Sequence, residues 1–125
     1  MNTKQDIHHD PRPVDLALMR ETTRTLLTPD AVPEALPPCA DELDTLTRVL
    51  RGHLELLVPE VETVAGGIDR QSIQRYCALA CVGEARGKLR AEPKPGLHGA
   101  VGHARRLARV LNALCEHYEN LSVQP

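Results

Sequence analysis

The stretch HARRLARVLNALCEHYENL, residues 103–121, carries the pattern that decides the fold. Its leucines and alanines recur at steps of three and four, which is the spacing of one face of an α-helix. Arginine, histidine, cysteine, glutamate and tyrosine side chains fill the positions between them. The stretch is therefore either a chemical site or the wall of a helical bundle, and its regular apolar spacing favours the wall.

The same spacing extends this helix toward the N-terminus and predicts a second long helix. The helix that contains the quoted stretch should begin at about Leu97 and bury Val101, Ala104, Leu107, Ala108, Leu111, Leu114, Tyr118 and Leu121. The second long helix should run from about Asp41 to Ala65 and bury Leu43, Leu46, Leu50, Leu54, Leu57, Val61 and Val64. Pro59 lies inside the second helix, so a kink or short break is expected over 57–60. The glycine pair Gly66-Gly67 should end it.

Two shorter helices complete the pattern. One should begin after Asp15, a suitable N-cap, and follow the positions Leu16, Met19, Thr23, Leu26 and Leu27. The other is expected between the long helices, with Asp69 as its cap and Ile73, Tyr76, Ala80, Val82 and Leu89 as its apolar positions. The prolines and glycine of 93–96 should stop it before the last helix begins.

No segment alternates apolar and polar residues with the period of a β-strand, so the predicted fold is all-α. Four apolar stripes must be buried against one another, which an antiparallel, up-and-down four-helix bundle satisfies. Residues 1–12 are polar and are expected to form a flexible tail. The proline-rich segment TPDAVPEALPP, residues 28–38, should be an irregular connector, and residues 13–125 should form one domain.

Composition disfavours several classes of function. The net charge is −2, and the chain contains no Phe or Trp and only two Tyr, so a nucleic-acid partner is not expected. No helix-turn-helix spacing is evident either. The chain lacks the apolar run of a signal peptide or a membrane span, which predicts a cytoplasmic protein without a membrane partner. Its four cysteines should then remain thiols.

Metal chemistry has one candidate cluster. Cys77, Cys81 and Glu84 share one helix face, and Cys115 and His117 could join them from the last helix. The paired CxxC knuckles of common zinc sites are absent, and free cysteines are often buried as small apolar residues. A di-metal bundle site would need Glu-x-x-His motifs, which the chain lacks. We therefore expect core cysteines, no metal and no cofactor.

Five polar residues are the candidates for binding a ligand or a partner. His53 and Glu60 lie along nearly one face of the second helix, and with Arg105 and Tyr118 they could form a polar pocket between the two long helices. Arg105 and Arg109 are spaced to form a basic row for an acidic partner. In each case a structural role, as a boundary hydrogen bond or a solvated helix face, is the more common one. No catalytic residues are assigned.

The segments RGHL, PEVE, GEAR, HARRLAR and HYENL, in this order, resemble a family of short actinobacterial proteins of unknown function associated with natural-product biosynthesis. The resemblance covers about Pro13 to Leu121 and implies a bacterial setting, without catalytic residues to carry over. The predicted function is that of a non-catalytic accessory or regulatory protein that binds a protein partner or forms a homodimer. The alternative is a small enzyme or ligand-binding protein that uses the polar pocket.

Overall fold

The computed structural model describes residues 14–27 and 39–123, which form four α-helices and no strand. The helices are α2 (Leu16–Leu27), α3 (Ala40–Gly66), α4 (Ile73–Arg90) and α5 (Gly96–Ser122). The predicted all-α class is confirmed. The expected tail, residues 1–12, and the expected connector, residues 28–38, lie outside the described residues. Of the helices described, none is both long and apolar enough to cross a membrane.

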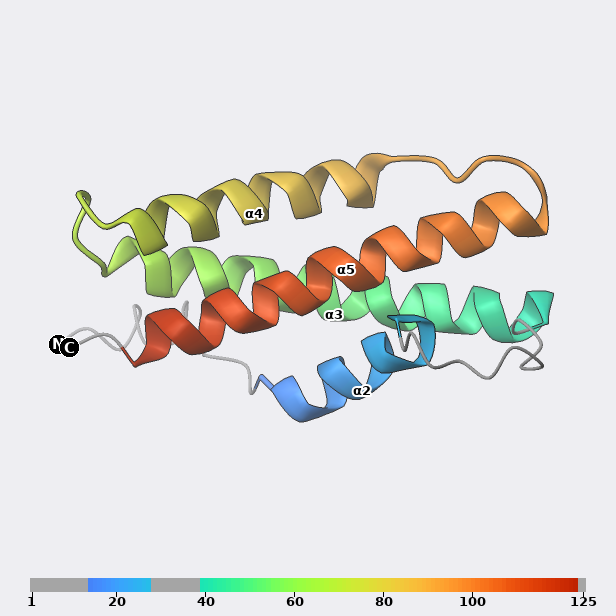
Figure 1. The fold of residues 1–125 in the computed structure, drawn as a ribbon, viewed down its shortest axis with the longest axis horizontal. Helices are drawn as coiled ribbons and strands as arrows, with labels where there is room; N and C mark the ends of the chain where they lie inside the picture. The colour runs from blue at the N-terminus through green and yellow to red at the C-terminus, as the bar shows by residue number, and fades with distance from the viewer. Residues whose placement is uncertain (1–13, 28–38, 124–125) are drawn as a thin grey trace, which may run out of the picture.

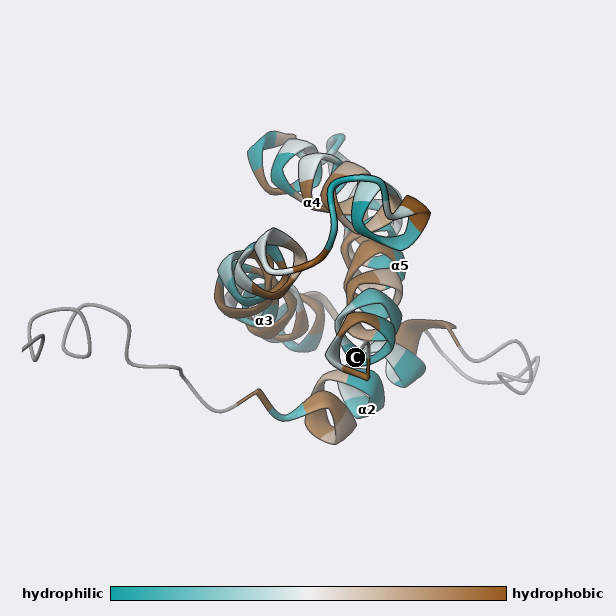
Figure 2. Ribbon diagram, turned by 90° about the vertical axis from the view of Figure 1, so that its left-hand side faces the viewer, coloured by the Kyte–Doolittle hydropathy of each residue, from teal (hydrophilic) through white to brown (hydrophobic). Residues whose placement is uncertain are grey.

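The four helices form an up-and-down bundle in which successive helices run in opposite directions (Figure 1). The two long helices, α3 and α5, therefore run in the same direction, and they pack side by side. Viewed from one end, α2 and α4 flank this central pair on opposite sides (Figure 2) and do not touch each other. Helices α3 and α5 each contact all three other helices.

The core is centred on leucines of the two long helices. The side chains without exposed surface include Leu50, Leu54, Leu57, Leu107, Leu111 and Leu114. Full burial of a leucine contributes about 1.5–3 kcal/mol relative to an exposed one, so these rows supply much of the driving force for folding. The stripes predicted for α3 and α5 are confirmed at these positions.

Helix α3 continues through Pro59, so the expected break is wrong. Proline cannot donate a backbone hydrogen bond, and the carbonyl that loses its donor belongs to Glu55, an exposed residue on the solvent side. Val58 and Val61, on either side of the proline, are buried in the core. Packing of these neighbours holds one continuous helix, which ends at Gly67 as expected.

The start of α4 differs from the prediction. Ser72 is the N-cap, and its hydroxyl accepts a hydrogen bond of 3.2 Å from the amide of Arg75. Asp69 instead accepts one of 3.0 Å from the amide of Gln71, within the turn that precedes the helix. The expected Asp69 cap is therefore wrong, because this carboxylate is already used by the turn.

The apolar face predicted for α4 is confirmed only in part: Val82 is buried and Leu89 packs against the core, whereas the other predicted positions are exposed. Its buried residues are small, namely Ala78, Cys81, Val82 and Ala85. Ile73 and Tyr76 are 78 % and 75 % exposed, and Ala80 is exposed as well. The predicted set mixed residues of two opposite sides, because both sides of α4 carry apolar or small residues at helical spacing.

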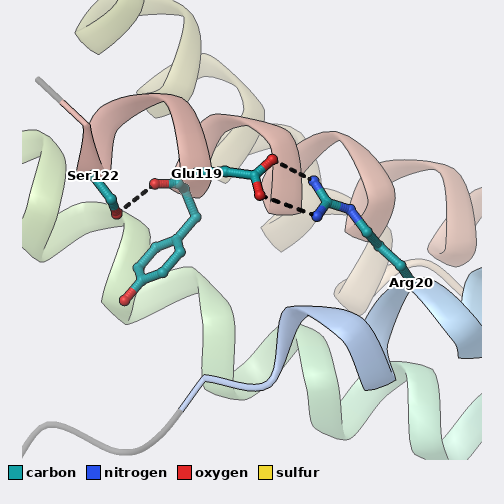
Figure 3. A network of polar contacts seen from close by, with 4 residues as sticks. Arg20, Glu119 and Ser122 are labelled. Carbon is teal, nitrogen blue, oxygen red and sulfur yellow. Dashed lines mark hydrogen bonds and ion pairs between the residues drawn. The ribbon is translucent and has the colours of Figure 1, made fainter.

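Helix α2 packs through Met19, Thr23 and Leu26. Asp15 caps it as predicted, since its carboxylate accepts a hydrogen bond of 3.0 Å from the amide of Leu18. On the outside of the bundle, the guanidinium group of Arg20 donates to both carboxylate oxygens of Glu119 on α5, at 3.0 and 3.4 Å (Figure 3). This bidentate ion pair joins the first described helix to the last.

Candidate functional site

His53 lies half-buried on α3 and faces α2. Its Nε2 atom is 3.4 Å from the hydroxyl of Thr22. Burial lowers the pKa of His53, and the nearby charge of Asp15 partly opposes this effect. A neutral imidazole that bridges two helices has the geometry of a structural contact.

The other predicted pocket residues do not join His53. Glu60 and Tyr118 are half-buried. The backbone carbonyl of Tyr118 accepts a hydrogen bond of 2.7 Å from the hydroxyl of Ser122 (Figure 3). Within the described part of the chain, no hydrogen bond or ion pair joins any two of the five predicted binding residues.

The predicted basic row lies on the outer side of α5. Arg105 and Arg109 are both exposed, and neither forms an ion pair with another described residue. On α4, the guanidinium group of Arg86 pairs with the carboxylate of Glu62 on α3 at 2.7 Å, so its charge is compensated. The two arginines of α5 thus remain open to solvent.

The cysteines of the metal candidate are separated by burial. Cys77 is exposed, whereas Cys81 and Cys115 are buried. Burial raises the pKa of both buried thiols to about 11, so they stay protonated at neutral pH and are poor nucleophiles and metal ligands. Among the residues that the structure describes, no three His, Cys, Asp or Glu side chains are grouped as a metal site would require.

A cavity of about 330 Å³ lies at a place that the sequence analysis did not select. It is formed between the start of α3 and the start of α5, which meet at the same end of the bundle (Figure 1). Helix α3 contributes Ala40, Leu43, Asp44 and Thr47, while α5 and the preceding connector contribute Pro93, Gly96, Leu97, Ala100 and His103. The walls are mainly apolar, with three polar side chains, and none of the five predicted binding residues lines them.

His103 is the most buried ionisable group of this cavity, with 5 % of its surface exposed. Burial lowers the pKa of His103, the charges of Arg51 and Arg106 lower it further, and Glu92 opposes them. The imidazole forms no hydrogen bond with another described residue. No fully buried side-chain nitrogen or oxygen in the described chain lacks a partner, so the ring nitrogens of His103 still reach open space.

The position of His103 offers a sequence signal that was overlooked. His103 precedes Leu107 and Leu111 by steps of four, which places it on the inward face of α5 with the leucines. In the sequence analysis it is placed with the polar residues between the apolar positions. Helical spacing alone would have placed this histidine in the core.

The connector between α4 and α5 closes the other wall of the cavity. Gly96 has a φ of +86°, a left-handed conformation that residues with a side chain rarely adopt. A Cβ atom at Gly99 would overlap the backbone carbonyl of Lys94, so this part of the connector lies directly on the first turn of α5. These two glycines let the chain reverse tightly and bring Pro93 to the cavity.

The fold and the cavity together define a small all-α bundle with a mainly apolar pocket. The chain belongs to a family of unknown function, DUF6415, whose model matches residues 17–123. No curated protein and no solved structure matches the chain.

Proposed function

We propose that the protein is a non-catalytic accessory or regulatory protein of a cytoplasmic natural-product pathway in actinobacteria, and that it acts through protein–protein binding. The pathway and the bacterial setting rest on the resemblance of segments such as HARRLAR and HYENL. The binding role rests on one observation, the apolar outer face of α4.

The outer face of α4 carries Ile73, Tyr76, Cys77, Ala80, Gly83 and Gly87, with Glu84 as the charged residue among them. These residues recur at steps of three and four on the side of the helix opposite its buried residues. All are exposed except the half-buried Gly87. A solvent-facing helix side is normally polar, so an apolar one indicates a surface that another protein covers.

The outer face of α4 is complementary to a second copy of itself. Its large residues, Ile73 and Tyr76, lie in the N-terminal half, and its glycines lie in the C-terminal half. A Cβ at Gly83 or Gly87 would meet no atom within 4 Å, so space is open above both. Antiparallel pairing centred on Ala80 would set Ile73 over Gly87 and Cys77 over Gly83, which permits close packing of the helices.

The charges around this face fit the same pairing. With Ala80 at the two-fold axis, Glu84 of one copy faces the hydroxyl of Tyr76 of the other. Asp69, exposed just before α4, similarly approaches Arg90 at the end of the opposite helix. Opposite charges at the two ends favour the antiparallel over the parallel arrangement.

A single helix pair buries less than the ~1,600 Å² of a standard stable interface, so the dimer should be weak and concentration-dependent. Analytical ultracentrifugation of the full chain across a wide concentration range should show monomer–dimer exchange. Ala80→Glu should abolish the dimer, because two carboxylates would meet at its axis. Gln74→Glu adds the same charge at an exposed position on another side of α4 and serves as the matched control.

Mixing Ala80→Glu with Ala80→Lys chains should restore association as a heterodimer, since the axis then holds opposite charges. A wild-type chain that stays monomeric throughout, or an Ala80→Glu dimer as strong as that of Gln74→Glu, would refute the α4 interface.

The basic row of Arg105 and Arg109 supports a second contact with the pathway partner. Both guanidinium groups are exposed and unpaired among the described residues, so they can steer an acidic segment of another protein. Binding of a polyglutamate peptide that weakens on Arg105→Ser/Arg109→Ser, and with added salt, would support this contact.

A further inference from the structure

The cavity around His103 is independent of the α4 interface and combines features of a small-molecule site. Its volume of about 330 Å³ lies at the lower end of the ~300–1,000 Å³ range of ligand pockets. Leu43, Leu97 and Ala100 give it apolar walls. A buried imidazole without a hydrogen-bond partner in the described chain lines the same space.

The first turn of α5 adds further donors to this region. The N-cap of α5 is Pro95, which has no side chain able to accept hydrogen bonds from the first amides of the helix. Helix α3 differs, since Glu42 and Cys39 form a capping box at its start. Uncapped amides and the positive end of the helix dipole favour a negatively charged group near the start of α5.

The charges near His103 favour an anion for a separate reason. Arg51 of α3 and Arg106 of α5 are close enough to act on the imidazole, and Glu92 of the connector opposes them. Asp44, the acidic residue that lines the cavity, forms an ion pair with Arg48, and this pair compensates its charge. The local balance is therefore positive.

We propose that this cavity binds a small monocarboxylate with a short apolar chain. The carboxylate accepts a hydrogen bond from the imidazole of His103, and the chain packs against Leu43, Leu97 and Ala100. Thr47 lines the same wall, but its hydroxyl donates its hydrogen bond to the carbonyl of Leu43 at 2.8 Å. This hydroxyl can therefore act only as an acceptor toward a ligand. Among the side chains that line the cavity, His103 is thus the donor for the carboxylate.

Three probes of equal length test this ligand class, namely hexanoate, hexan-1-ol and hexylamine. Each is titrated into the ¹⁵N-labelled full chain, and backbone amide shifts are followed. Hexanoate should shift the amides of 97–103 and 40–47 and bind about tenfold more tightly than the alcohol, because charge-assisted hydrogen bonds are the stronger ones. Equal affinity for all three probes, tightest binding of hexylamine, or no shifts in these segments would overturn the proposal.

Two variants separate the roles of the imidazole and of the apolar walls. His103→Gln should weaken hexanoate about tenfold and leave hexan-1-ol unchanged. Ala100→Leu should fill the cavity and weaken every probe, whereas Ala113→Leu, at a half-buried alanine of the same helix outside the cavity, should weaken none. Loss of both ligands in His103→Gln, or full binding in Ala100→Leu, would contradict the assigned geometry.

The imidazole itself gives an independent readout that needs no variant. A bound carboxylate should raise the pKa of His103 against the opposing effect of Arg51 and Arg106, while Glu92 and Asp44 remain the same in both states. Titration of the ring ¹⁵N resonances with and without saturating hexanoate measures this change. An unchanged or lowered pKa on saturation would show that the carboxylate does not contact His103.

Discussion

Helices α5 and α4 distribute their apolar residues in different ways. Helix α5 concentrates large ones on one inward face, where Leu107, Leu111 and Leu114 are fully buried. Helix α4 turns small residues such as Ala78 and Ala85 inward and exposes Ile73. The difference shows that helical spacing identifies a face, and residue size decides whether that face supplies core volume or allows close approach.

The largest effect is expected from removing volume at the centre of α5. Leu111→Ala should lower the free energy of unfolding by about 2–5 kcal/mol, through lost burial and the cavity left behind. Urea denaturation measures this loss. Leu18→Ala, at a leucine of α2 that is 50 % exposed, is the control and should cost much less. Equal costs would break the distinction between the α5 core and the bundle surface.

A smaller effect is expected from adding volume to the inner face of α4. Ala85 is fully buried, so Ala85→Leu should destabilise the fold by about 1–3 kcal/mol through overpacking. Ala80→Leu makes the same change on the outer face and should leave the unfolding free energy of the monomer nearly unchanged. Denaturation at low protein concentration compares the two. A tolerated Ala85→Leu would show that α4 does not pack closely.

These two helices also show how far the sequence could predict the fold. Helix α5 has one dominant apolar side, so its buried face could be predicted from the spacing, and Leu111 and Leu114 are buried as expected. Two apolar sides made α4 ambiguous, so Ile73 and Tyr76 were assigned to the wrong one. The cavity depends on the connector lying against Gly99, a tertiary contact that no helical period encodes.

The free energy of unfolding should depend modestly on pH, because α5 carries a histidine in its inner face. Helix α4 contains no histidine and should not contribute to this dependence. Burial lowers the folded-state pKa of His103 and of His53, while an unfolded histidine titrates near 6.5. The unfolded chain therefore binds more protons below this pH. The stability that these histidines contribute should be fully present above a pH of about 6.5. It should be lost as the pH falls toward their lower folded-state pKa values.

Urea denaturation at several pH values measures this slope. His103→Gln should flatten it, with the His53 contribution remaining, while His98→Gln, at an exposed histidine of α5, should not. A slope of opposite sign would mean that the folded state stabilises the imidazolium form.

The smallest effect is expected on the outer side of α5. Arg105→Ser/Arg109→Ser should change the unfolding free energy by no more than about 0.5 kcal/mol per site, since both guanidinium groups are solvated. Thermal melting monitored by circular dichroism provides the measurement. A loss comparable to that of Leu111→Ala would mean that these arginines are internal bridges, and the proposed partner contact would fail.

The contacts of α5 with all three other helices have a consequence for synthesis on the ribosome. Arg20 and Glu119 are 99 positions apart, so α2 cannot reach its docking site until almost the whole described chain has been made. The α3–α4 hairpin can form earlier because its contacts are local. Until α5 emerges, the leucines of α3 in this hairpin lack the partner that buries them, and such transiently exposed apolar surface is prone to aggregation.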